Sequence, residues 1–456
     1  MKQNDKRIET LSHEKPVRAV IKMGVPLILG MFIMVLYNLV DTYFIGLMKD
    51  DYRLAAVNLA YPVLMISVAV ANITGTGAGT LIARCLGADD RDKANHTLTT
   101  GILLTVINSL IVTAVGLVFL PAIITGLGAK DNTFEYTRQY VGILLAGSLF
   151  TMGNYTFGQL LRSEGSVKYS IVGMMVGTVV NIALDPLFIF TFGMGIQGAA
   201  LATILGNGAG MAVSLLFYLR KKSLLRPAVR WLRPSGKIVR EIFWVGVPAS
   251  LETLLTSAAF IINNNLAVSY GELTVAAIGI AQKLLTLGNY IYQGFASGTQ
   301  PIMGYSFGAK NFSRMLQVLK SGILVVSVTE LAVMAVYAVC APWLIGIFTD
   351  SGEVIEIGAR VLRTLMLILP FVGATSMSRM SFQAMGKPQY AFSITLVRQL
   401  FLYIPLLLLL NYLCGFSGLL LAQPITEVIM MAVSVFLLYR VIRKEAKKYE
   451  SKNTIV

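Results

Sequence analysis

The chain has 456 residues, of which 55% are hydrophobic and 13% are charged, whereas about 25% of the residues in a soluble globular domain are charged. This composition excludes water as the main solvent of the folded chain. The formal net charge of +15 would suit a nucleic-acid-binding protein, but the basic residues lie in loops on alternate sides of apolar segments, so we expect no nucleic acid partner.

The N-terminal segment, residues 1–23, is polar and basic. It lacks the apolar region and the small-residue cleavage site of a secretory signal peptide. We therefore expect a cytoplasmic N-terminal segment, followed by a first apolar helix that acts as its own insertion signal.

Apolar stretches of roughly 20 residues, the length that crosses a bilayer as an α-helix, recur along the whole chain. Bilayer-spanning β-barrels have short alternating segments instead, so we predict an all-α integral membrane protein. The predicted spans form two sets of six, at residues 24–47, 56–83, 98–124, 139–161, 168–190 and 197–219, and at residues 242–268, 274–302, 318–345, 361–384, 389–411 and 417–439.

The two sets of spans form an internal repeat at an offset of about 221 residues. The sequence GVP occurs at 24–26 and again at 246–248, and Gly165 matches Gly386. Each half has an even number of spans, so both halves enter the membrane from the same side and the repeat is parallel. The predicted domains are two pseudo-symmetric six-helix lobes at 24–219 and 241–440, a basic cytoplasmic linker at 220–240 and a cytoplasmic tail at 441–456.

The basic residues predict the orientation. With a cytoplasmic N-terminus, the two tails and the even-numbered loops hold 29 Lys and Arg residues, whereas the opposite side holds six. Cytoplasmic loops of membrane proteins are enriched in Lys and Arg. We therefore predict a multi-pass protein of the cell membrane with both termini in the cytoplasm.

Acidic residues at mid-membrane depth are the main candidates for chemistry, because each costs about 2.5–3.5 kcal/mol to insert and needs a partner or a wet cavity. Asp41 lies on the first span and Asp185 on the fifth, with Asn181 one helical turn before Asp185. If these helices adjoin, their oxygens would suit a proton or a hard cation such as Na+. Alternatively, Asp185 lies near the outer end of its helix, where Asp-Pro begins a break.

The second half differs at the position equivalent to Asp41, where it has Asn263. An amide keeps hydrogen bonding but loses the charge, so we expect ion coupling in the first half. Asn263 itself and Glu252 on the seventh span are secondary candidates for coupling or substrate binding. Lys283 on the eighth span is either functional or simply the structural partner of Glu252. Glu330 has no predicted partner, and it either snorkels or faces the cavity.

Aromatic and thioether side chains suit flat or cationic drugs, although at helical spacing most of them face lipid or the core. The chain contains 20 Met, 22 Phe and 19 Tyr residues. The candidates for lining a substrate cavity are Tyr37, Asn154, Tyr155, Phe157, Tyr290, Tyr292 and Phe295.

We expect no cofactor and no enzymatic activity. The sequence has no Walker lysine motif, and its two histidines lie in peripheral positions. The cysteines Cys85, Cys340 and Cys414 are too widely separated for a metal-ligand spacing or a disulfide framework. The energy for transport must then come from a gradient of H+ or Na+, or from downhill flow.

The chain resembles the multidrug and toxic compound extrusion (MATE) family over essentially its whole length. The resemblance rests on GVPLILG and YNLVDTYFIG of span one, GTLIARCLGADDRDKAN after span two, NIALDPLFIFTFGMGIQGAALAT across spans five and six, and GVPASLE of span seven. It implies two six-helix lobes around a central cavity, alternating access, and antiport of organic cations or drugs against H+ or Na+.

The resemblance also implies site residues. By similarity to DinF-like members, the cation site of the first lobe comprises Asp41, Asn181, Asp185 and Thr203. In NorM-like members an acid on span seven also matters, and it matches Glu252. These members usually add an acid on span ten, which this sequence lacks between residues 360 and 384, so the first-lobe mechanism is favoured.

In the expected mechanism, a proton or cation and the drug compete. Binding at Asp41 and Asp185 neutralises the site and reshapes the first span, with Pro26 as the hinge; a kink without motion is the alternative for Pro26. We expect a monomer. The alternative functions are a flippase for lipid-linked saccharides from a related superfamily branch, and an uncoupled channel or scaffold.

Overall fold

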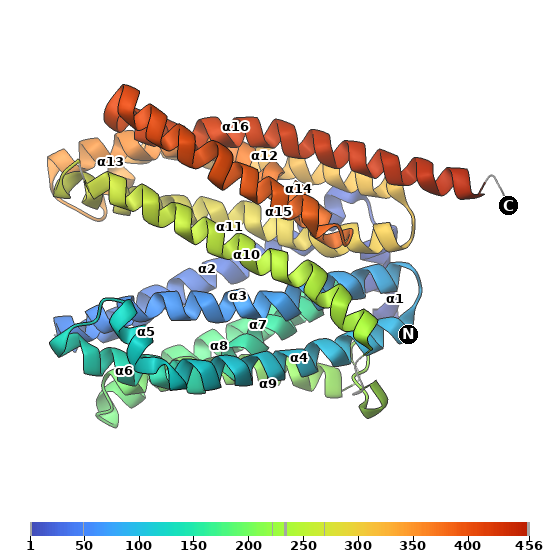
Figure 1. The fold of residues 1–456 in the computed structure, drawn as a ribbon, viewed down its shortest axis with the longest axis horizontal. Coiled ribbons are helices and arrows are strands. Elements are labelled where there is room, and N and C mark those ends of the chain that lie inside the picture. The colour runs from blue at the N-terminus through green and yellow to red at the C-terminus, as the bar shows by residue number, and fades with distance from the viewer. Residues whose placement is uncertain (1, 49, 221, 232–234, 269, 454–456) are drawn as a thin grey trace. The chain divides into compact units, whose positions relative to one another are not determined.

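The computed structural model describes residues 2–48, 50–220, 222–231, 235–268 and 270–453. Over these ranges the chain is helical and has no strand (Figure 1), which confirms the predicted all-α fold. The predicted N-terminal segment, linker and C-terminal tail fall partly on residues 1, 221, 232–234 and 454–456, which lie outside the described residues.

The helices of the first half begin with a short polar helix that precedes the first span. They are α1 (Lys2–Ser12), α2 (Pro16–Gly46), α3 (Asp51–Gly87), α4 (Arg91–Val118), α5 (Leu120–Gly126), α6 (Asp131–Ala146), α7 (Ser148–Ser163), α8 (Val167–Pro186), the π-helix η1 (Leu187–Thr191), α9 (Ile196–Leu219) and the 3-10 helix η2 (Val229–Trp231).

The second half has the same succession of long helices. They are α10 (Gly236–Val268), α11 (Glu272–Gly308), α12 (Phe312–Gly346), α13 (Gly352–Leu365), the 3-10 helix η3 (Met366–Ile368), α14 (Leu369–Ala384), α15 (Pro388–Leu396), the π-helix η4 (Val397–Tyr403) and α16 (Ile404–Asn453).

The predicted spans map onto these helices, but several spans are interrupted. The fourth span consists of α6 and α7, which meet at Gly147, and the tenth consists of α13, η3 and α14. The last two spans share α16, whose backbone leaves the helical region at Gly415. Eight helical stretches of the described residues are long and apolar enough to cross a membrane by length and composition.

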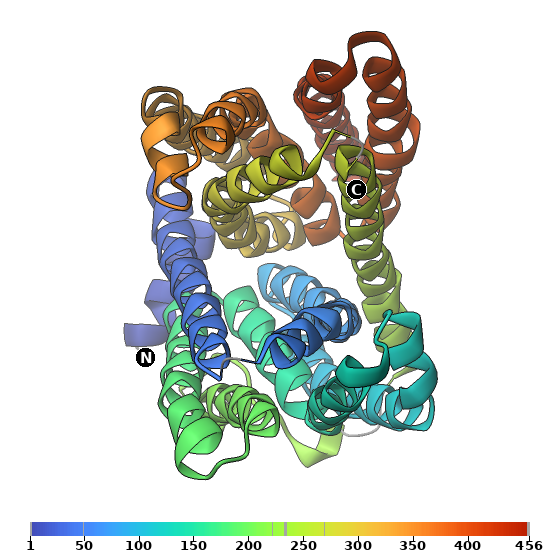
Figure 2. The same cartoon turned by 90° about the vertical axis from the view of Figure 1, so that its left-hand side faces the viewer.

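The chain divides into two compact units. Unit 1 comprises Met1–Glu9 and Leu29–Ser250, and unit 2 comprises Thr10–Ile28 and Leu251–Val456. The division falls within α1, α2 and α10. The first part of α2 and the first part of α10 each belong with the spans of the other half of the chain. Seen end-on in Figure 2, the spans of each half gather into a bundle.

Each unit has its own apolar core. In unit 1, the core includes side chains of α2, α3, α6 and α9, such as Ile45, Tyr140 and Ile196. In unit 2, it includes side chains of α10 to α14 and of α16, such as Leu284, Leu362 and Leu407. Many large apolar side chains point outward as well, as expected for helices surrounded by lipid.

The internal repeat is visible in the backbone. Positions with positive φ, which L-residues seldom adopt, recur in both halves at offsets of 220 or 221 residues. The pairs are Asp89 (55°) with Lys310 (56°), Gly165 (80°) with Gly386 (71°), and Gly195 (56°) with Gly415 (55°). The ψ values of the last pair, −130° and −136°, agree as well. The two halves therefore turn in the same way at equivalent places.

A buried polar cluster in unit 1 involves α1. Glu164, in the turn between α7 and α8, is fully buried and accepts hydrogen bonds from the hydroxyls of Ser166 (2.7 Å) and Ser223. Arg7 of α1 lies 4.0 Å from Glu164 Oε1 and donates to the Lys222 carbonyl at 2.9 Å. Burial raises the pKa of Glu164 even though these hydrogen bonds oppose the shift.

In unit 2, the end of α1 is bound by a second buried arginine. Arg314 of α12 donates to the carbonyl oxygens of Leu11 (3.0 Å), Glu14 (3.0 Å) and Thr10 (3.2 Å). The last carbonyls of a helix have no partner within the helix. Arg314 therefore caps α1 at its C-terminal end.

Gly246→Ala should lower the stability of the protein, because a Cβ at Gly246 of α10 would lie 1.9 Å from the carbonyl oxygen of Ile73 of α3. A backbone oxygen cannot rotate away, and overpacking costs about 1–3 kcal/mol. Gly279→Ala is the matched control, because a Cβ at this helical glycine meets nothing within 4 Å. The melting temperatures of the purified proteins test this; equal values for both variants would contradict the close packing of α10 on α3.

Glu164→Gln should remove a pH dependence of stability. A carboxyl whose pKa is raised by folding contributes stability that is fully present below its unfolded pKa and is lost as the pH rises through its folded pKa. The wild-type melting temperature should therefore fall relative to that of the variant as the pH rises through this range. Parallel curves for the two proteins would show that burial does not raise the pKa of Glu164.

Candidate coupling site

Three helices of unit 1 supply the four residues predicted for the cation site. Asp41 lies on α2, Asn181 and Asp185 lie on α8, and Thr203 lies on α9. All four side chains are buried, with exposed fractions of 8%, 3%, 0% and 6%. Asp185 directly precedes Pro186 and the π-helix η1, so this residue is both fully buried and next to a change of helix type.

Glycines bring α8 and α9 close together. A Cβ at Gly177 of α8 would lie 2.9 Å from the carbonyl oxygen of Gly206 of α9, and one at Gly173 would lie 3.1 Å from that of Gly210. The spacing on each helix is the small-xxx-small pattern that lets membrane helices approach closely. A Cβ at Gly206 would also lie 2.7 Å from Cβ of Asn181, so this packing holds the site residues of α8 against α9.

Hydrogen bonds connect the site to neighbouring helices. The Tyr37 hydroxyl of α2 lies 3.5 Å from the Thr203 hydroxyl. Asn207 Nδ2 donates to the Thr203 carbonyl at 2.9 Å, and Asn154 Nδ2 of α7 donates to Asn207 Oδ1 at 3.0 Å. Tyr37 and Asn154, predicted for the substrate cavity, thus lie beside the cation site. Asn207 was not among the predicted residues, although it lies one helical turn after Thr203 and so shares its face of α9.

Several buried polar atoms of the site lack a hydrogen bond. Asp41 Oδ1, both carboxylate oxygens of Asp185 and both amide atoms of Asn181 have no partner among the residues that the structure describes. Buried polar atoms normally have partners in the protein, in water or in a bound ion. These atoms are thus the ones that a proton or cation would satisfy.

The charges of the two buried carboxylates also require a partner. The carboxylates of Asp41 and Asp185 are both buried in unit 1. Two buried like charges are costly unless one is protonated or a cation neutralises them. Within the described part of the chain, no three His, Cys, Asp or Glu side chains form a metal cluster, so a bound Na+ would also use the neutral oxygens of Asn181 and Thr203.

The other aromatic residues predicted to line the substrate cavity lie in different environments. Phe157 is buried, with its ring 6.0 Å from that of Tyr218, and Phe295 is buried beside Gly24 within unit 2. Both occupy packing positions. The Tyr155 hydroxyl donates to Asn72 Oδ1 at 2.8 Å. Tyr290 and Tyr292 of α11 are half-buried.

In unit 2, Glu252 of α10 pairs with an arginine of α14. Arg379 Nη1 lies 2.6 Å from Glu252 Oε2, and Gln383 Nε2 donates to the same oxygen at 3.1 Å. The structural partner considered from the sequence, Lys283, is exposed instead. The tenth span, which has no acidic residue between positions 360 and 384, therefore supplies the cation that neutralises Glu252.

Two further buried carboxylates lie in unit 2. Glu330 of α12 is fully buried, and neither of its carboxylate oxygens has a hydrogen-bond partner among the described residues; it does not snorkel. Glu427 of α16 is also fully buried and pairs with Arg398 of η4. The sequence analysis missed Glu427, although it is an acid within an apolar span like the other candidates.

Glu252→Gln should leave efflux partly intact and lower stability by roughly 1–3 kcal/mol, because Arg379 would lose its anionic partner. The double variant Glu252→Gln/Arg379→Gln should recover part of the lost stability, since no charge is left unpaired. Melting temperatures and ethidium efflux would be measured for both variants. Complete loss of efflux by Glu252→Gln at normal membrane abundance would place ion coupling in unit 2.

Comparisons with known proteins cover most of the chain. The MatE family model matches residues 26–187 and 248–409, which together make up more than half of the chain. The multidrug export protein MepA of Staphylococcus aureus is 28% identical over 422 residues, covering 92% of this chain and 93% of the relative. MepA of Staphylococcus saprophyticus is 27% identical over 435 residues, covering 95% and 96%.

Solved structures agree with the family match. An outward-facing multidrug resistance MATE transporter of the MOP superfamily has a TM-score of 0.91 and is 28% identical, covering 96% of this chain and 98% of its own. A MOP superfamily transporter from Pyrococcus furiosus has a TM-score of 0.90, with the same identity and coverage. The two-lobe layout of twelve spans fits these structures. The chain therefore belongs to the MATE family of membrane transporters.

Proposed function

We propose that the protein exports organic cations or drugs across the cell membrane in exchange for H+ or Na+. Its family and the multidrug export relatives support the drug substrate. The observation that carries the ion exchange is the pair of buried carboxylates, Asp41 and Asp185, with three of their oxygens lacking hydrogen bonds among the described residues.

The proposed exchange works by competition. In the empty site, the negative charges of Asp41 and Asp185 attract a cationic substrate toward this part of unit 1. A proton or Na+ at the two carboxylates neutralises them, so the attraction for the cationic substrate falls and the substrate is released. The residues of this chain thus provide one set of charges for two competing ligands.

The hinge is proposed at Pro26. A proline within a helix cannot donate the backbone hydrogen bond to the residue four positions earlier, and it weakens the helix there. The boundary between the two units falls between Ile28 and Leu29, within one turn of Pro26 on α2. A bend at this point would move Asp41 relative to the first part of the same helix.

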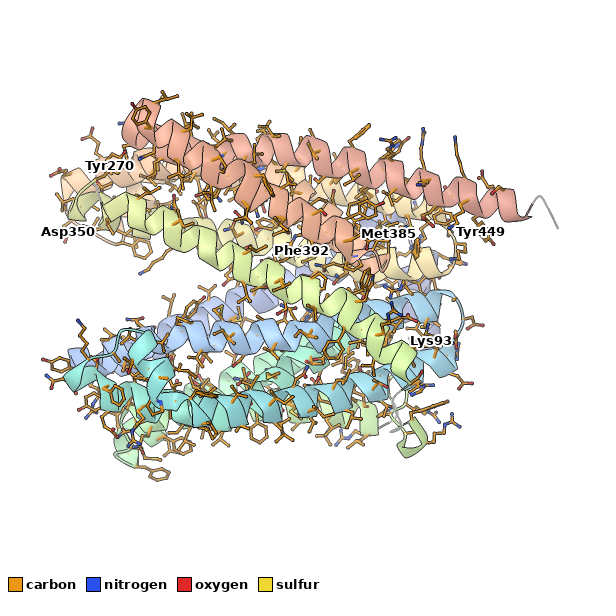
Figure 3. All side chains as sticks on the ribbon, in the orientation of Figure 1. Lys93, Tyr270, Asp350, Met385, Phe392 and Tyr449 are labelled. Carbon is orange, nitrogen blue, oxygen red and sulfur yellow. The ribbon has the colours of Figure 1, made fainter. Side chains whose placement is uncertain are left out.

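The proposed orientation places both termini in the cytoplasm. The excess of basic residues in the tails and even-numbered loops supports it. The fold of unit 2 fits the alternation that this orientation requires, because Tyr270 and Asp350 lie toward one end of the bundle while Met385 and Tyr449 lie toward the other (Figure 3). We also propose that a monomer suffices, since the four coupling residues belong to one unit.

The saccharide flippase is less well supported. A flippase for an anionic lipid-linked substrate would need unneutralised cations in its cavity. The arginines Arg379 and Arg398, which lie within predicted spans of the second half, are instead paired with Glu252 and Glu427. The uncoupled channel remains the alternative that the following experiment tests.

Asp41→Asn should abolish gradient-driven efflux. Asn keeps the size and hydrogen bonding of Asp but neither exchanges a proton nor supplies a full charge to Na+. Asn263 shows that the repeat accommodates an amide at the equivalent position, so folding should survive. Efflux of ethidium would be measured in vesicles in which the pH gradient and the sodium gradient are imposed separately.

The matched control is Glu135→Gln, a second carboxylate-to-amide change. Glu135 is exposed and pairs with Arg138 of the same helix at 2.8 Å, away from the site. This variant should pump like the wild type. Wild-type efflux by an equally abundant Asp41→Asn variant would refute coupling in unit 1, and efflux that ignores both gradients would support the uncoupled channel.

A further inference from the structure

The last helix of unit 2 continues past the end of its predicted span. That span ends at residue 439, whereas α16 ends at Asn453. The red end of α16 reaches beyond the ends of the neighbouring helices of unit 2 (Figure 1). The proposed coupling mechanism gives no role to this extension.

One line of side chains on α16 faces lipid within the span. Ile429, Val433 and Phe436 are 41%, 46% and 66% exposed, and steps of four and three residues place them on one side of the helix. Exposed apolar side chains within a membrane span contact the lipid chains. Phe436 is thus the last lipid-facing residue on this line before the sequence becomes basic.

The same line continues with basic residues. Arg440 lies four residues after Phe436, Arg443 lies three residues further, and Lys444 is adjacent to Arg443. We call Arg440, Arg443 and Lys444 the basic stripe. All three side chains are exposed, and none forms an ion pair with another residue that the structure describes. The stripe therefore carries positive charges that the described part of the protein leaves without a counter-ion.

The opposite face of the same turns packs on unit 2. Leu438 and Ile442 are fully buried, and Glu445 forms an ion pair at 2.8 Å with Lys387, in the turn between α14 and α15. These contacts fix the rotation of the helix. The basic stripe therefore stays on the lipid side, whereas Glu445 points away from it.

The stripe lies at the depth of the lipid headgroups. An α-helix rises about 1.5 Å per residue, so Arg440 and Lys444 lie roughly 6 and 12 Å beyond Phe436, next to a headgroup layer roughly 5–8 Å thick. Side chains of a helix lean toward its N-terminus, which for α16 is the membrane side, and the long stems of Arg and Lys extend this reach. Arg443 has this direction, because its guanidinium carbon lies 4.4 Å from the ring centroid of Tyr439, one turn closer to the membrane.

Figure 3 agrees with an outward direction, since nitrogen-tipped side chains project from the last turns of α16 away from the rest of unit 2. We propose that the basic stripe binds the phosphate groups of anionic phospholipids in the lipid layer next to α16. Guanidinium and ammonium groups bind phosphate oxygens through charge-assisted hydrogen bonds, and basic residues next to a membrane helix attract anionic lipids. A zwitterionic phospholipid offers the same phosphate together with its own ammonium group, so its net attraction is much smaller. This proposal does not depend on drug export.

The lipid beside the stripe can be measured with the full-length protein in bilayer vesicles. Phe436→Trp places a tryptophan one turn from Arg440, in a parent protein whose three natural tryptophans are replaced by Trp231→Phe/Trp244→Phe/Trp343→Phe. Brominated lipids quench the fluorescence of a tryptophan that they contact. Quenching by brominated phosphatidylglycerol, which is anionic, would be compared with quenching by brominated phosphatidylcholine, which is zwitterionic.

The parent protein should prefer phosphatidylglycerol about tenfold at about 0.1 M salt, where electrostatic attraction reaches about 10 Å. Arg443→Gln/Lys444→Gln should bring the ratio of the two affinities close to one, because a basic residue near a membrane surface changes the affinity by roughly fivefold. The matched control is Lys447→Gln/Lys448→Gln, which removes the same charge from the same helix roughly 16–18 Å beyond Phe436. Most of the preference should remain in this control.

Two further measurements need no change in the stripe. Raising the salt to about 1 M shortens the electrostatic reach to about 3 Å and should lower the preference of the parent protein. Glycerol phosphate, which has the headgroup without the lipid chains, should leave the ratio unchanged. Equal quenching by the two lipids, a preference that ignores salt, or one that survives Arg443→Gln/Lys444→Gln would overturn the proposal. So would displacement by glycerol phosphate, because the site would then belong to a soluble phosphate.

Discussion

The cost of placing a carboxylate in the membrane interior shapes this protein more than any other constraint. The chain reduces this cost in two ways. In unit 2, Glu252 and Glu427 each contact an arginine from a neighbouring helix, so both become part of the helix packing. In unit 1, Asp41 and Asp185 have no cationic partner among the described residues, so neutralisation is left to a mobile ligand. The same repeat thus carries fixed counter-ions for Glu252 and Glu427 in unit 2 and, by our proposal, exchangeable ones for Asp41 and Asp185 in unit 1. Glu330 of unit 2 is the exception, because it is buried and neither of its oxygens has a hydrogen-bond partner among the described residues.

Close helix packing makes this difference possible. The glycines of α8 and α9 let two backbones approach without side chains between them, which holds Asn181 against α9 and leaves Asp185 fully buried. In the second half, the π-helix η4 widens the turn at the corresponding depth and makes room for Arg398 and Tyr403. Local backbone geometry, rather than a different topology, distinguishes the coupling site of unit 1 from the ion pairs of unit 2.

Hydropathy and the repeat were sufficient to predict the helical class and the approximate spans, because these depend on residue type and spacing alone. The break at Gly147 was not predicted, since the apolar run of the fourth span continues through it, whereas Gly415 lies between the predicted eleventh and twelfth spans. Nor was the partner of Glu252, because Arg379 lies 127 residues away and only tertiary packing brings the two together. The cap that Arg314 places on α1 depends on a separation of about 300 residues for the same reason.

The binding of α1 by Arg7 and Arg314 has a practical consequence for handling the protein. Deleting the first twelve residues would remove the carbonyl oxygens that Arg314 contacts at Thr10 and Leu11, and would uncover the buried carboxyl of Glu164 by removing Arg7. A bulky affinity tag joined directly to the N-terminus would press on the same packed segment. Purification tags therefore belong after the long, polar end of α16, where Lys447, Lys448 and Glu450 already face water.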